Sequence, residues 1–313
     1  MQLSKIIAFV FISVSAILLS CGDPDISPDM IDGEVIFDAS LYDPEAFLVS
    51  YSNPNPTLEE AEIPVIIVSH GYSASTFEWN EFREWNDSNP EILISQVLLS
   101  GHGRTYDEFK TSNWRDWSGS ILEEYDRLVM SGYKNIHFAG SSTSSTLILD
   151  IVKSGYFNDK VVPGNIFLID PIIIPSSKSL SLVGILGPML GYIEADNTLD
   201  EDKYWYHFRP EETLRELMKL MNEVRKDLQN GIVLPSGCAL KVYKSKRDPT
   251  ADPASAVLIY KGVQSADGDP IEIEMIDSDL HVFTRLSLRA GVVQKDVLNQ
   301  QNTFEDILDR ILN

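Results

Sequence analysis

Short runs of β-branched apolar residues recur along this chain, and helical patterns lie between them. The runs are continuous rather than alternating with polar residues, which is typical of strands buried on both faces. Strands separated by helices join through right-handed crossovers into a mostly parallel sheet. The sequence therefore predicts an α/β fold with a mostly parallel central sheet flanked by helices, with strands at 63–69, 95–100, 135–139, 165–170, 239–243 and 271–276.

The alternation of strand and helix patterns stops between Pro171 and Gly237. An apolar stretch at 179–193 is interrupted by glycines and a proline, so it makes a poor single helix. An amphipathic helix pattern then begins at Pro210. These features predict a small cap insertion at about 172–236, between two strands of the sheet.

Residues 1–20 have the pattern of an export signal, with a charged start and an uncharged apolar run that is short for a membrane-spanning helix. The end of this segment, Leu18-Leu19-Ser20-Cys21, resembles the bacterial lipobox, in which the cysteine becomes lipidated after cleavage. We therefore expect a lipoprotein of the bacterial cell envelope that is anchored at Cys21. The sequence does not indicate which membrane face carries the anchor. The alternative is an ordinary signal peptide with an incidental cysteine. Residues 21–35 are acidic and predict a flexible tether, which leaves 36–313 as one domain.

The amino-acid composition limits which partners and cofactors this protein is expected to have. The 25 Lys and Arg against 47 Asp and Glu give a formal charge of −22, which disfavours nucleic acid and anionic lipid surfaces as partners. The two cysteines are too few for a disulfide framework or a zinc site. The sequence also lacks a glycine-rich phosphate loop. We therefore expect no metal and no cofactor.

A serine-rich turn follows the strand at 135–139. The segment Gly140-Ser141-Ser142-Thr143-Ser144 lies between this strand and a helix pattern at 146–152, which is the context of a nucleophile elbow. Small residues are needed on both sides of the nucleophile because the turn brings strand and helix close together. The alternative is ordinary turn chemistry, since serine-rich loops are common.

A serine needs a base to take its proton, and the base needs a third group to orient it. Of the five histidines, only His281 lies in a loop after the last strand. Asp248 lies in the loop after the strand at 239–243 and is the first candidate for the acid. Asp252 and Asp170 are the alternatives, although Asp252 also fits a turn-forming Asp-Pro pair.

The order serine, aspartate, histidine, each after its own strand, belongs to the α/β-hydrolase fold. From about residue 60 to 313, the chain resembles the monoacylglycerol lipase and carboxylesterase branch of that superfamily. The stretches that carry the resemblance are Val68-Ser69-His70-Gly71-Tyr72, Leu99-Ser100-Gly101-His102-Gly103, Trp114 with Asp116-Trp117, the elbow, Lys246-Arg247-Asp248 with Asp252-Pro253, and the cap helix at 213–228. The sequence departs from the family pattern at Ser100, Ser144 and Ser145, where proline and two glycines are usual.

The resemblance implies a serine hydrolase that cleaves carboxylic esters. It implies Ser142 as nucleophile, Asp248 as acid, His281 as base, and the backbone N–H groups of Tyr72 and Thr143 as the oxyanion hole. Amidase, peptidase and thioesterase activities use the same triad and stay open, as does an inactive lipoprotein that uses this fold for binding. A haloalkane dehalogenase is disfavoured, because it needs a carboxylate where Ser142 stands.

The substrate is expected to be a short- to medium-chain acyl ester or a monoglyceride. The apolar stretch of the cap is longer than a tight turn needs, so its side chains are candidates for an acyl pocket: Leu182, Ile185, Leu186 and Met189. The alternative is that they only pack the cap onto the sheet.

Overall fold

A six-stranded sheet forms the centre of the molecule, with the strand order β10-β8-β4-β3-β1-β2. This computed structural model describes residues 24–27, 29–33, 56–88, 91–176 and 191–313. Every neighbouring pair of strands in this sheet is parallel, which confirms the predicted sheet type. The strands are β1 (Val65–Ser69), β2 (Leu93–Val97), β3 (Ile136–Ser141), β4 (Asn165–Ile169), β8 (Ala239–Ser245) and β10 (Glu272–Ile276).

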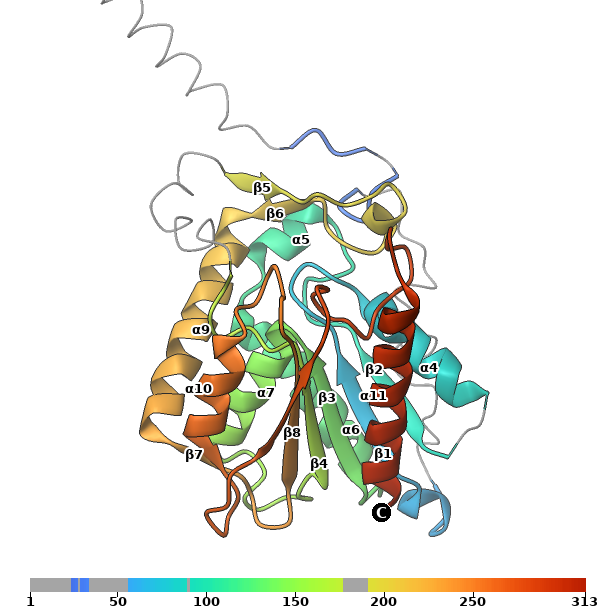
Figure 1. The fold of residues 1–313 in the computed structure, drawn as a ribbon, viewed down its shortest axis with the longest axis vertical. Helices are drawn as coiled ribbons and strands as arrows, with labels where there is room; N and C mark the ends of the chain where they lie inside the picture. Colours follow the sequence, from blue (N-terminus) through green and yellow to red (C-terminus); the bar gives the residue numbers. More distant parts are fainter. Residues whose placement is uncertain (1–23, 28, 34–55, 89–90, 177–190) are drawn as a thin grey trace, which may run out of the picture.

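Helices cover both faces of the sheet, as Figure 1 shows. One face packs against α6 (Trp114–Met130), α7 (Thr143–Lys153) and α10 (Ala254–Gly262), and the other against α4 (Asn80–Asp87) and α11 (Gln294–Leu312). The continuous apolar run of β1 explains this arrangement, because successive side chains of a strand point to opposite faces. Val65 and Ile67 belong to the first core, and Ile66 and Val68 to the second.

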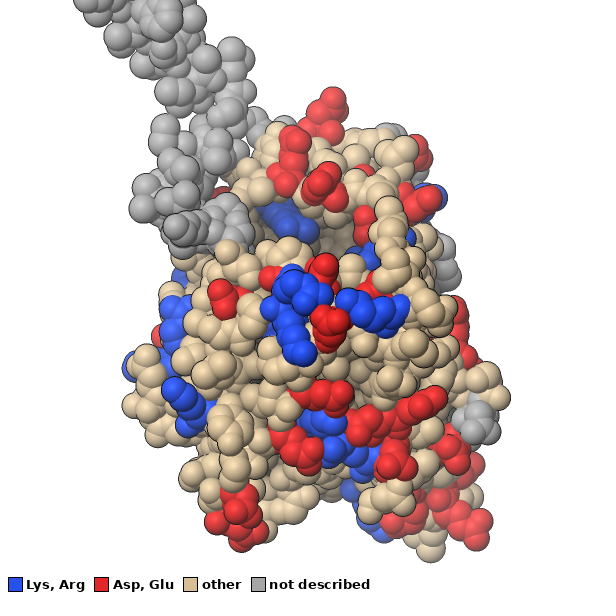
Figure 2. Space-filling view, in the orientation of Figure 1, with Lys and Arg blue, Asp and Glu red and all other residues tan. Residues whose placement is uncertain are grey.

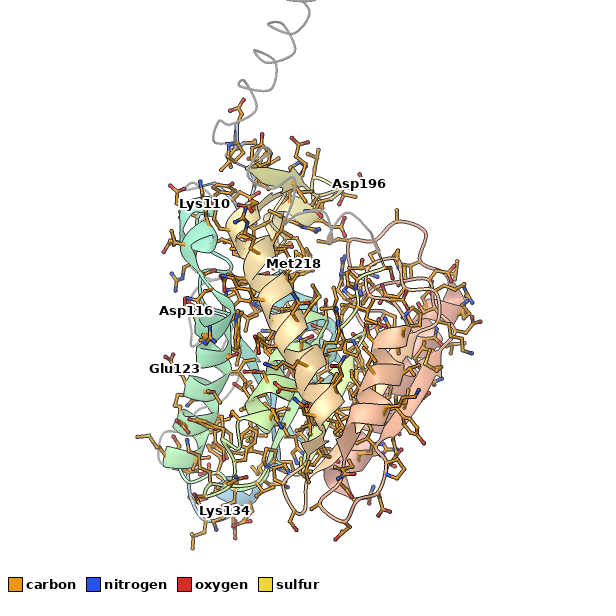
Figure 3. All side chains as sticks on the ribbon, turned by 90° about the vertical axis from the view of Figure 1, so that its left-hand side faces the viewer. Lys110, Asp116, Glu123, Lys134, Asp196 and Met218 are labelled. Carbon is orange, nitrogen blue, oxygen red and sulfur yellow. The ribbon has the colours of Figure 1, made fainter. Side chains whose placement is uncertain are left out.

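The described part of the predicted cap divides into two. The antiparallel pair β5 (Tyr192–Glu194) and β6 (Phe208–Pro210) lies at one end of the molecule beside α5 (Tyr106–Thr111) (Figure 1). In the perpendicular view, Asp196 lies at this end and Lys134, which precedes β3, lies at the opposite end (Figure 3). The β5–β6 pair is therefore at the end where the strands finish.

The second part of the predicted cap is a long helix, α9 (Glu211–Asn230). It runs beside α10 (Figure 1), and its buried residues Leu220, Val224 and Leu228 belong to the main core. The amphipathic pattern from Pro210 thus predicts the helix correctly, but the helix packs as part of the main domain. A short parallel pair, β7 (Ile232–Val233) and β9 (Val263–Gln264), lies near the ends of α9 and α10.

The predicted acidic tether at 21–35 needs a correction over its last described residues. Ile31 and Asp32 are each only 2% exposed. The Ile31 N–H donates to the carbonyl of Asp202 at 2.8 Å, and the Asp32 carbonyl accepts from Tyr106 N–H at 3.0 Å. Ile31 is apolar enough to join the core, so the folded domain begins before residue 33. Cys21 and the signal segment lie outside the described residues, and no described helix is long and apolar enough to cross a membrane.

Candidate active site

Ser142 lies on a sharp turn between β3 and α7. Its backbone has φ 49° and ψ −108°, a left-handed conformation that costs energy in any residue with a side chain. Glycine is required at position 140, since a Cβ there would lie 2.8 Å from the backbone of Ser144 and Ser145. A Cβ at Gly71 would lie 3.2 Å from the Cβ of Ser142. Strand, helix and the loop after β1 therefore meet closely around this serine.

Ser144 and Ser145, where the related elbows usually have glycine, are fully buried, and each hydroxyl has an acceptor. The Ser144 hydroxyl donates to the carbonyl of His70 at 2.5 Å, and the Ser145 hydroxyl donates to the carbonyl of Gly140 at 2.6 Å. The two serines that stand in place of glycine thus leave neither of their own hydroxyls unpaired. They also tie the start of α7 to β3 and to the loop after β1.

A chain of hydrogen-bond contacts joins Ser142, His281 and Asp248. The Ser142 Oγ is 2.8 Å from His281 Nε2, and His281 Nδ1 is 2.8 Å from Asp248 Oδ2. Because an ionised Asp248 can only accept a hydrogen bond, Nδ1 of His281 carries the hydrogen and donates it, which leaves Nε2 as the acceptor for the serine hydroxyl. The structure therefore brings together the three residues that the sequence predicts as a triad, from the loops after β3, β8 and β10.

Asp248 is held on both of its oxygens. Oδ1 accepts from the N–H groups of Thr250 at 2.8 Å and Ala251 at 3.0 Å, and Oδ2 accepts from His281 and from the ammonium of Lys244. Burial alone would raise the pKa of Asp248, but His281 and Lys244 outweigh it and lower this pKa to about 2. The carboxylate is therefore ionised at neutral pH.

The two alternative acids have other partners. Asp170 is fully buried, and its oxygens accept from Lys244, from the Ser245 amide and hydroxyl, and from Phe283 N–H. Asp252 accepts from Ala254 N–H at 2.8 Å in a turn before α10. Of the three predicted acids, Asp248 is the one with a hydrogen bond to His281 among the described residues. Lys244 contacts both Asp170 and Asp248, so a cation already lies between the two carboxylates nearest His281.

The predicted oxyanion residues lie on either side of Ser142. Tyr72 and Thr143 both line the cavity above the serine, and Thr143 is the first residue of α7, where N–H groups have no partner within the helix. The Tyr72 hydroxyl lies 2.7 Å from the Thr213 hydroxyl, which ties this loop to α9. Below them, the buried Glu78 accepts from Gly71 N–H at 2.8 Å and from the Ser141 hydroxyl. Sequence reasoning missed Glu78, which belongs to no motif.

The other four histidines lie in loops and strands away from Ser142. His70 is fully buried, accepts from Leu99 N–H at 3.1 Å, and donates to the Gly71 carbonyl at 2.9 Å. Burial lowers the pKa of His70 and of His137 to about 4, and that of His102 well below its usual value. His207 lies 3.1 Å from Asp202 at the β5–β6 end. None of these four contacts Ser142 in the described part of the chain.

A cavity of about 390 Å³ opens above Ser142, which is large enough for a small organic molecule. Figure 2 shows a hollow below the β5–β6 end, with basic side chains at its wall. Its apolar lining includes Ile172, Ile193, Leu214, Leu217 and Val282, and its charged lining includes Glu78, Asp196, Glu201, Arg209, Arg285 and Arg289. Sequence reasoning missed the arginines. The predicted pocket residues Leu182, Ile185, Leu186 and Met189 lie outside the described residues.

Several solved structures share the architecture of this chain. The structure of the metagenome-derived lipolytic enzymes LipS and LipT aligns over 80% of this chain and 94% of its own, with 19% identity and a TM-score of 0.63. A monoglyceride lipase from Saccharomyces cerevisiae aligns over 82% and 88%, with 12% identity and a TM-score of 0.62. Est1E from Butyrivibrio proteoclasticus, solved with ferulic acid, aligns over 85% and 94%, with 12% identity and a TM-score of 0.51.

The chain has the α/β-hydrolase fold. This confirms the fold expected from the order of the serine, aspartate and histidine. A scan of protein-family models finds no match, and a search of curated protein sequences finds none either. The α/β-hydrolase fold supports many chemistries, so the activity has to be argued from the site.

Proposed function

We propose that this protein is a serine hydrolase that cleaves carboxylic esters through an acyl-enzyme on Ser142. The observation that supports the proposal most is the hydrogen-bonded series from Ser142 to His281 to Asp248, with both inter-residue contacts at 2.8 Å. In a decayed hydrolase fold that only binds ligands, nothing would keep these three groups in register. Lipolytic enzymes and esterases with the same fold are consistent with an ester as substrate.

The first half of the reaction forms the acyl-enzyme. His281 Nε2 takes the proton of the Ser142 hydroxyl while Oγ attacks the ester carbonyl carbon. The oxygen of the tetrahedral intermediate accepts from the N–H groups of Tyr72 and Thr143, each worth about 3–4 kcal/mol in comparable sites. Asp248 stabilises the charged imidazole. When the intermediate collapses, the C–O bond to the alcohol breaks and the alcohol leaves with the proton from His281.

The second half releases the acid. His281 takes a proton from a water molecule, whose oxygen attacks the acyl carbon. The second tetrahedral intermediate expels Ser142 Oγ, which regains its proton from His281. The net reaction is ester plus water to carboxylic acid plus alcohol. The apolar part of the cavity wall, including Ile172, Leu214 and Leu217, is suited to a short- to medium-chain acyl group.

The proposal is tested by the hydrolysis of p-nitrophenyl butyrate. Ser142→Ala is expected to lower kcat by about 10³-fold or more, since loss of the nucleophile leaves only binding and the oxyanion hole. Ser154→Ala is the matched control, because it removes a hydroxyl at the other end of α7 that donates to Ile151. Equal activity of Ser142→Ala and the wild type would refute the proposal. Matched p-nitroanilide and thioester substrates distinguish an amidase or thioesterase from an esterase.

We also propose that Cys21 is lipidated and holds the protein in the bacterial cell envelope. The argument comes from the lipobox-like end of the signal segment. Ten peptide units separate Cys21 from the anchored Ile31, so the domain would lie within about 35 Å of the membrane. Partition of the expressed protein into the detergent phase, and its loss in Cys21→Ser, would support the anchor. A wild-type protein that stays in the aqueous phase would refute it.

A further inference from the structure

Three arginines line the cavity above Ser142, which is unusual for a site that only holds a neutral acyl chain. Arg209 is in β6, while Arg285 and Arg289 belong to the loop that follows His281. They therefore come to one cavity from two separate parts of the chain. Figure 2 shows basic side chains at this hollow, on a molecule with many acidic residues on its surface.

Arg285 has its own partners. Its Nη1 is 2.8 Å from Glu201 and donates to the Ser287 carbonyl at 3.0 Å. Its guanidinium also lies 4.2 Å from the ring centroid of Trp205. Arg285 is thus a fixed part of the wall whose charge is already compensated.

Arg289 has no carboxylate within ion-pair distance in the part of the chain that the structure describes. Its Nη2 donates to the backbone carbonyl of His281, and its other donors have no hydrogen-bond partner among the described residues, although the charges of Glu78, Glu201 and Asp170 act on it from a distance. Burial and the neighbouring Arg285 lower the pKa of Arg289 to about 10, so it is still charged at neutral pH. A cation therefore lies directly beside the loop that carries His281.

The side chain of Arg209 makes neither a hydrogen bond nor an ion pair with any described residue. Its Nε is fully buried and has no partner among them. The nearby carboxyl of Asp32 makes no ion pair with Arg209: its Oδ2 accepts from the N–H groups of His207 and Phe208, and its Oδ1 has no hydrogen-bond partner among the described residues. A half-buried guanidinium without a paired carboxylate is costly, unless a ligand supplies the counter-charge.

The carboxylates of the cavity wall do not fill this role. Glu78 accepts from Gly71 and Ser141, Glu201 is paired with Arg285, and Asp196 is exposed at the rim. The sequence at 177–190, which precedes β5, contains no Asp or Glu.

We propose that the ester hydrolysed by this protein carries an anionic group, a carboxylate or phosphate, that is bound by Arg209 and Arg289. A guanidinium binds either group with two parallel charge-assisted hydrogen bonds, which are stronger than neutral ones. The inference rests on the proposed ester hydrolysis and adds the substrate class. It departs from the expected monoglyceride, which has no charge.

Two matched pairs of esters test the proposal. The mono-p-nitrophenyl ester of glutarate, compared with its methyl ester, places the anion on the acyl side. The acetyl ester of 4-hydroxybenzoate, compared with the acetyl ester of methyl 4-hydroxybenzoate, places it on the alcohol side. The readout is the ratio of kcat/KM for the anionic and the neutral ester, corrected for spontaneous hydrolysis.

The same ratio is then measured in Arg209→Gln, Arg289→Gln and Arg209→Lys. For at least one pair, we expect the glutamine variants to lower the ratio by about 10- to 100-fold, as for loss of a charged hydrogen bond. Arg209→Lys should retain part of the preference, because it keeps the cation. Arg115→Gln is the matched control, since it removes the same charge from an exposed site on α6 and should leave the ratio unchanged.

The outcomes separate the two proposals. Hydrolysis of the neutral esters, with a ratio that no arginine variant changes, would overturn the anionic substrate and leave the esterase intact. No hydrolysis of any ester by the folded wild type would overturn both. A ratio that falls in one pair only supports the proposal and tells on which side of the ester the anion lies.

Discussion

Two groups of charges lie on either side of His281, one buried and one half-buried, and they differ in how they are paired. In the buried group, Lys244 contacts both Asp170 and Asp248, and the carboxylate oxygens accept further backbone hydrogen bonds. On the cavity side, Arg209 and Arg289 have no carboxylate partner among the described residues. A charge that stabilises a fold is paired with an opposite charge inside the protein. A charge that binds a ligand has no such partner in the free protein, and this lowers the stability of the fold. We therefore expect Asp170, Lys244 and Asp248 (the lower group) to stabilise the fold, and Arg209 and Arg289 (the upper group) to bind the ligand.

The largest expected effect is on the triad itself. Asp248→Asn is expected to lower kcat on p-nitrophenyl butyrate by about 10⁴-fold, because an amide cannot hold the required tautomer of the imidazole or stabilise its charge. Steady-state kinetics with an active-site titration measures the effect. A loss below about tenfold would mean that Asp170 or another group orients His281.

Removing the charge of Lys244, the cation of the lower group, should lower the stability of the fold. Lys244→Met leaves the two carboxylates of Asp170 and Asp248 buried without a counter-charge, which is expected to cost about 3–5 kcal/mol. Urea unfolding at pH 7 measures the free energy. Lys219→Met is the control, because Lys219 makes an exposed ion pair with Glu216 that is worth at most about 1 kcal/mol. Equal stability of the two variants would contradict the division between the groups.

The pH dependence of stability tests whether Asp32, the carboxyl near Arg209, is ionised. Burial raises the pKa of Asp32 to about 7 from a usual 3.8. The folded protein then holds a proton that the unfolded chain releases, so stability is lost as pH rises from about 4 to 7. The Asp32→Asn variant does not lose this stability. The difference between its melting temperature and that of the wild type should therefore grow from about pH 4 to 7, with the variant higher, and persist above pH 7. A lower melting temperature of the variant at pH 8 would mean that Asp32 is ionised and compensates Arg209.

The smallest effect is expected for the upper arginine. Arg209→Met should leave the free energy of unfolding within about 1 kcal/mol of the wild type, or raise it, because no partner is lost and a buried charge is removed. Urea unfolding beside Lys244→Met makes the comparison direct. A loss as large as that of Lys244→Met would show that Arg209 is a structural charge.

The sheet, and the meeting of Ser142, His281 and Asp248 at its edge, could be predicted because their signals are local. Buried strands have continuous apolar runs, and parallel strands finish at one edge, so polar residues after β3, β8 and β10 had to meet there. Gly140 indicates the turn in the sequence, because a close approach of strand and helix leaves no room for a side chain there. The start of α7 at Thr143 is harder to predict, since Ser and Thr are weak helix formers and the Ser144 hydroxyl donates to the carbonyl of His70, which is distant in the sequence.

The charges that distinguish this site could not be predicted in the same way. Lys244 lies on a strand that is buried on both sides, and only the fold brings it to Asp170. Arg209 and Arg289 belong to no motif, and whether an arginine is paired depends on contacts between distant segments. Ile31 and Asp32 fall within the predicted tether because acidic residues and glycine surround them, whereas their burial depends on contacts with Tyr106 and Asp202.

Labelling with a fluorophosphonate tests most directly whether Ser142 is a nucleophile activated by His281. The reagent forms a covalent bond to an activated serine, and peptide mass mapping locates the adduct. We expect one adduct on Ser142 in the wild type, none in Ser142→Ala, and much slower labelling in a His281→Gln variant. A folded wild type that takes up no label, or an adduct on a different serine, would contradict the proposed acyl-enzyme.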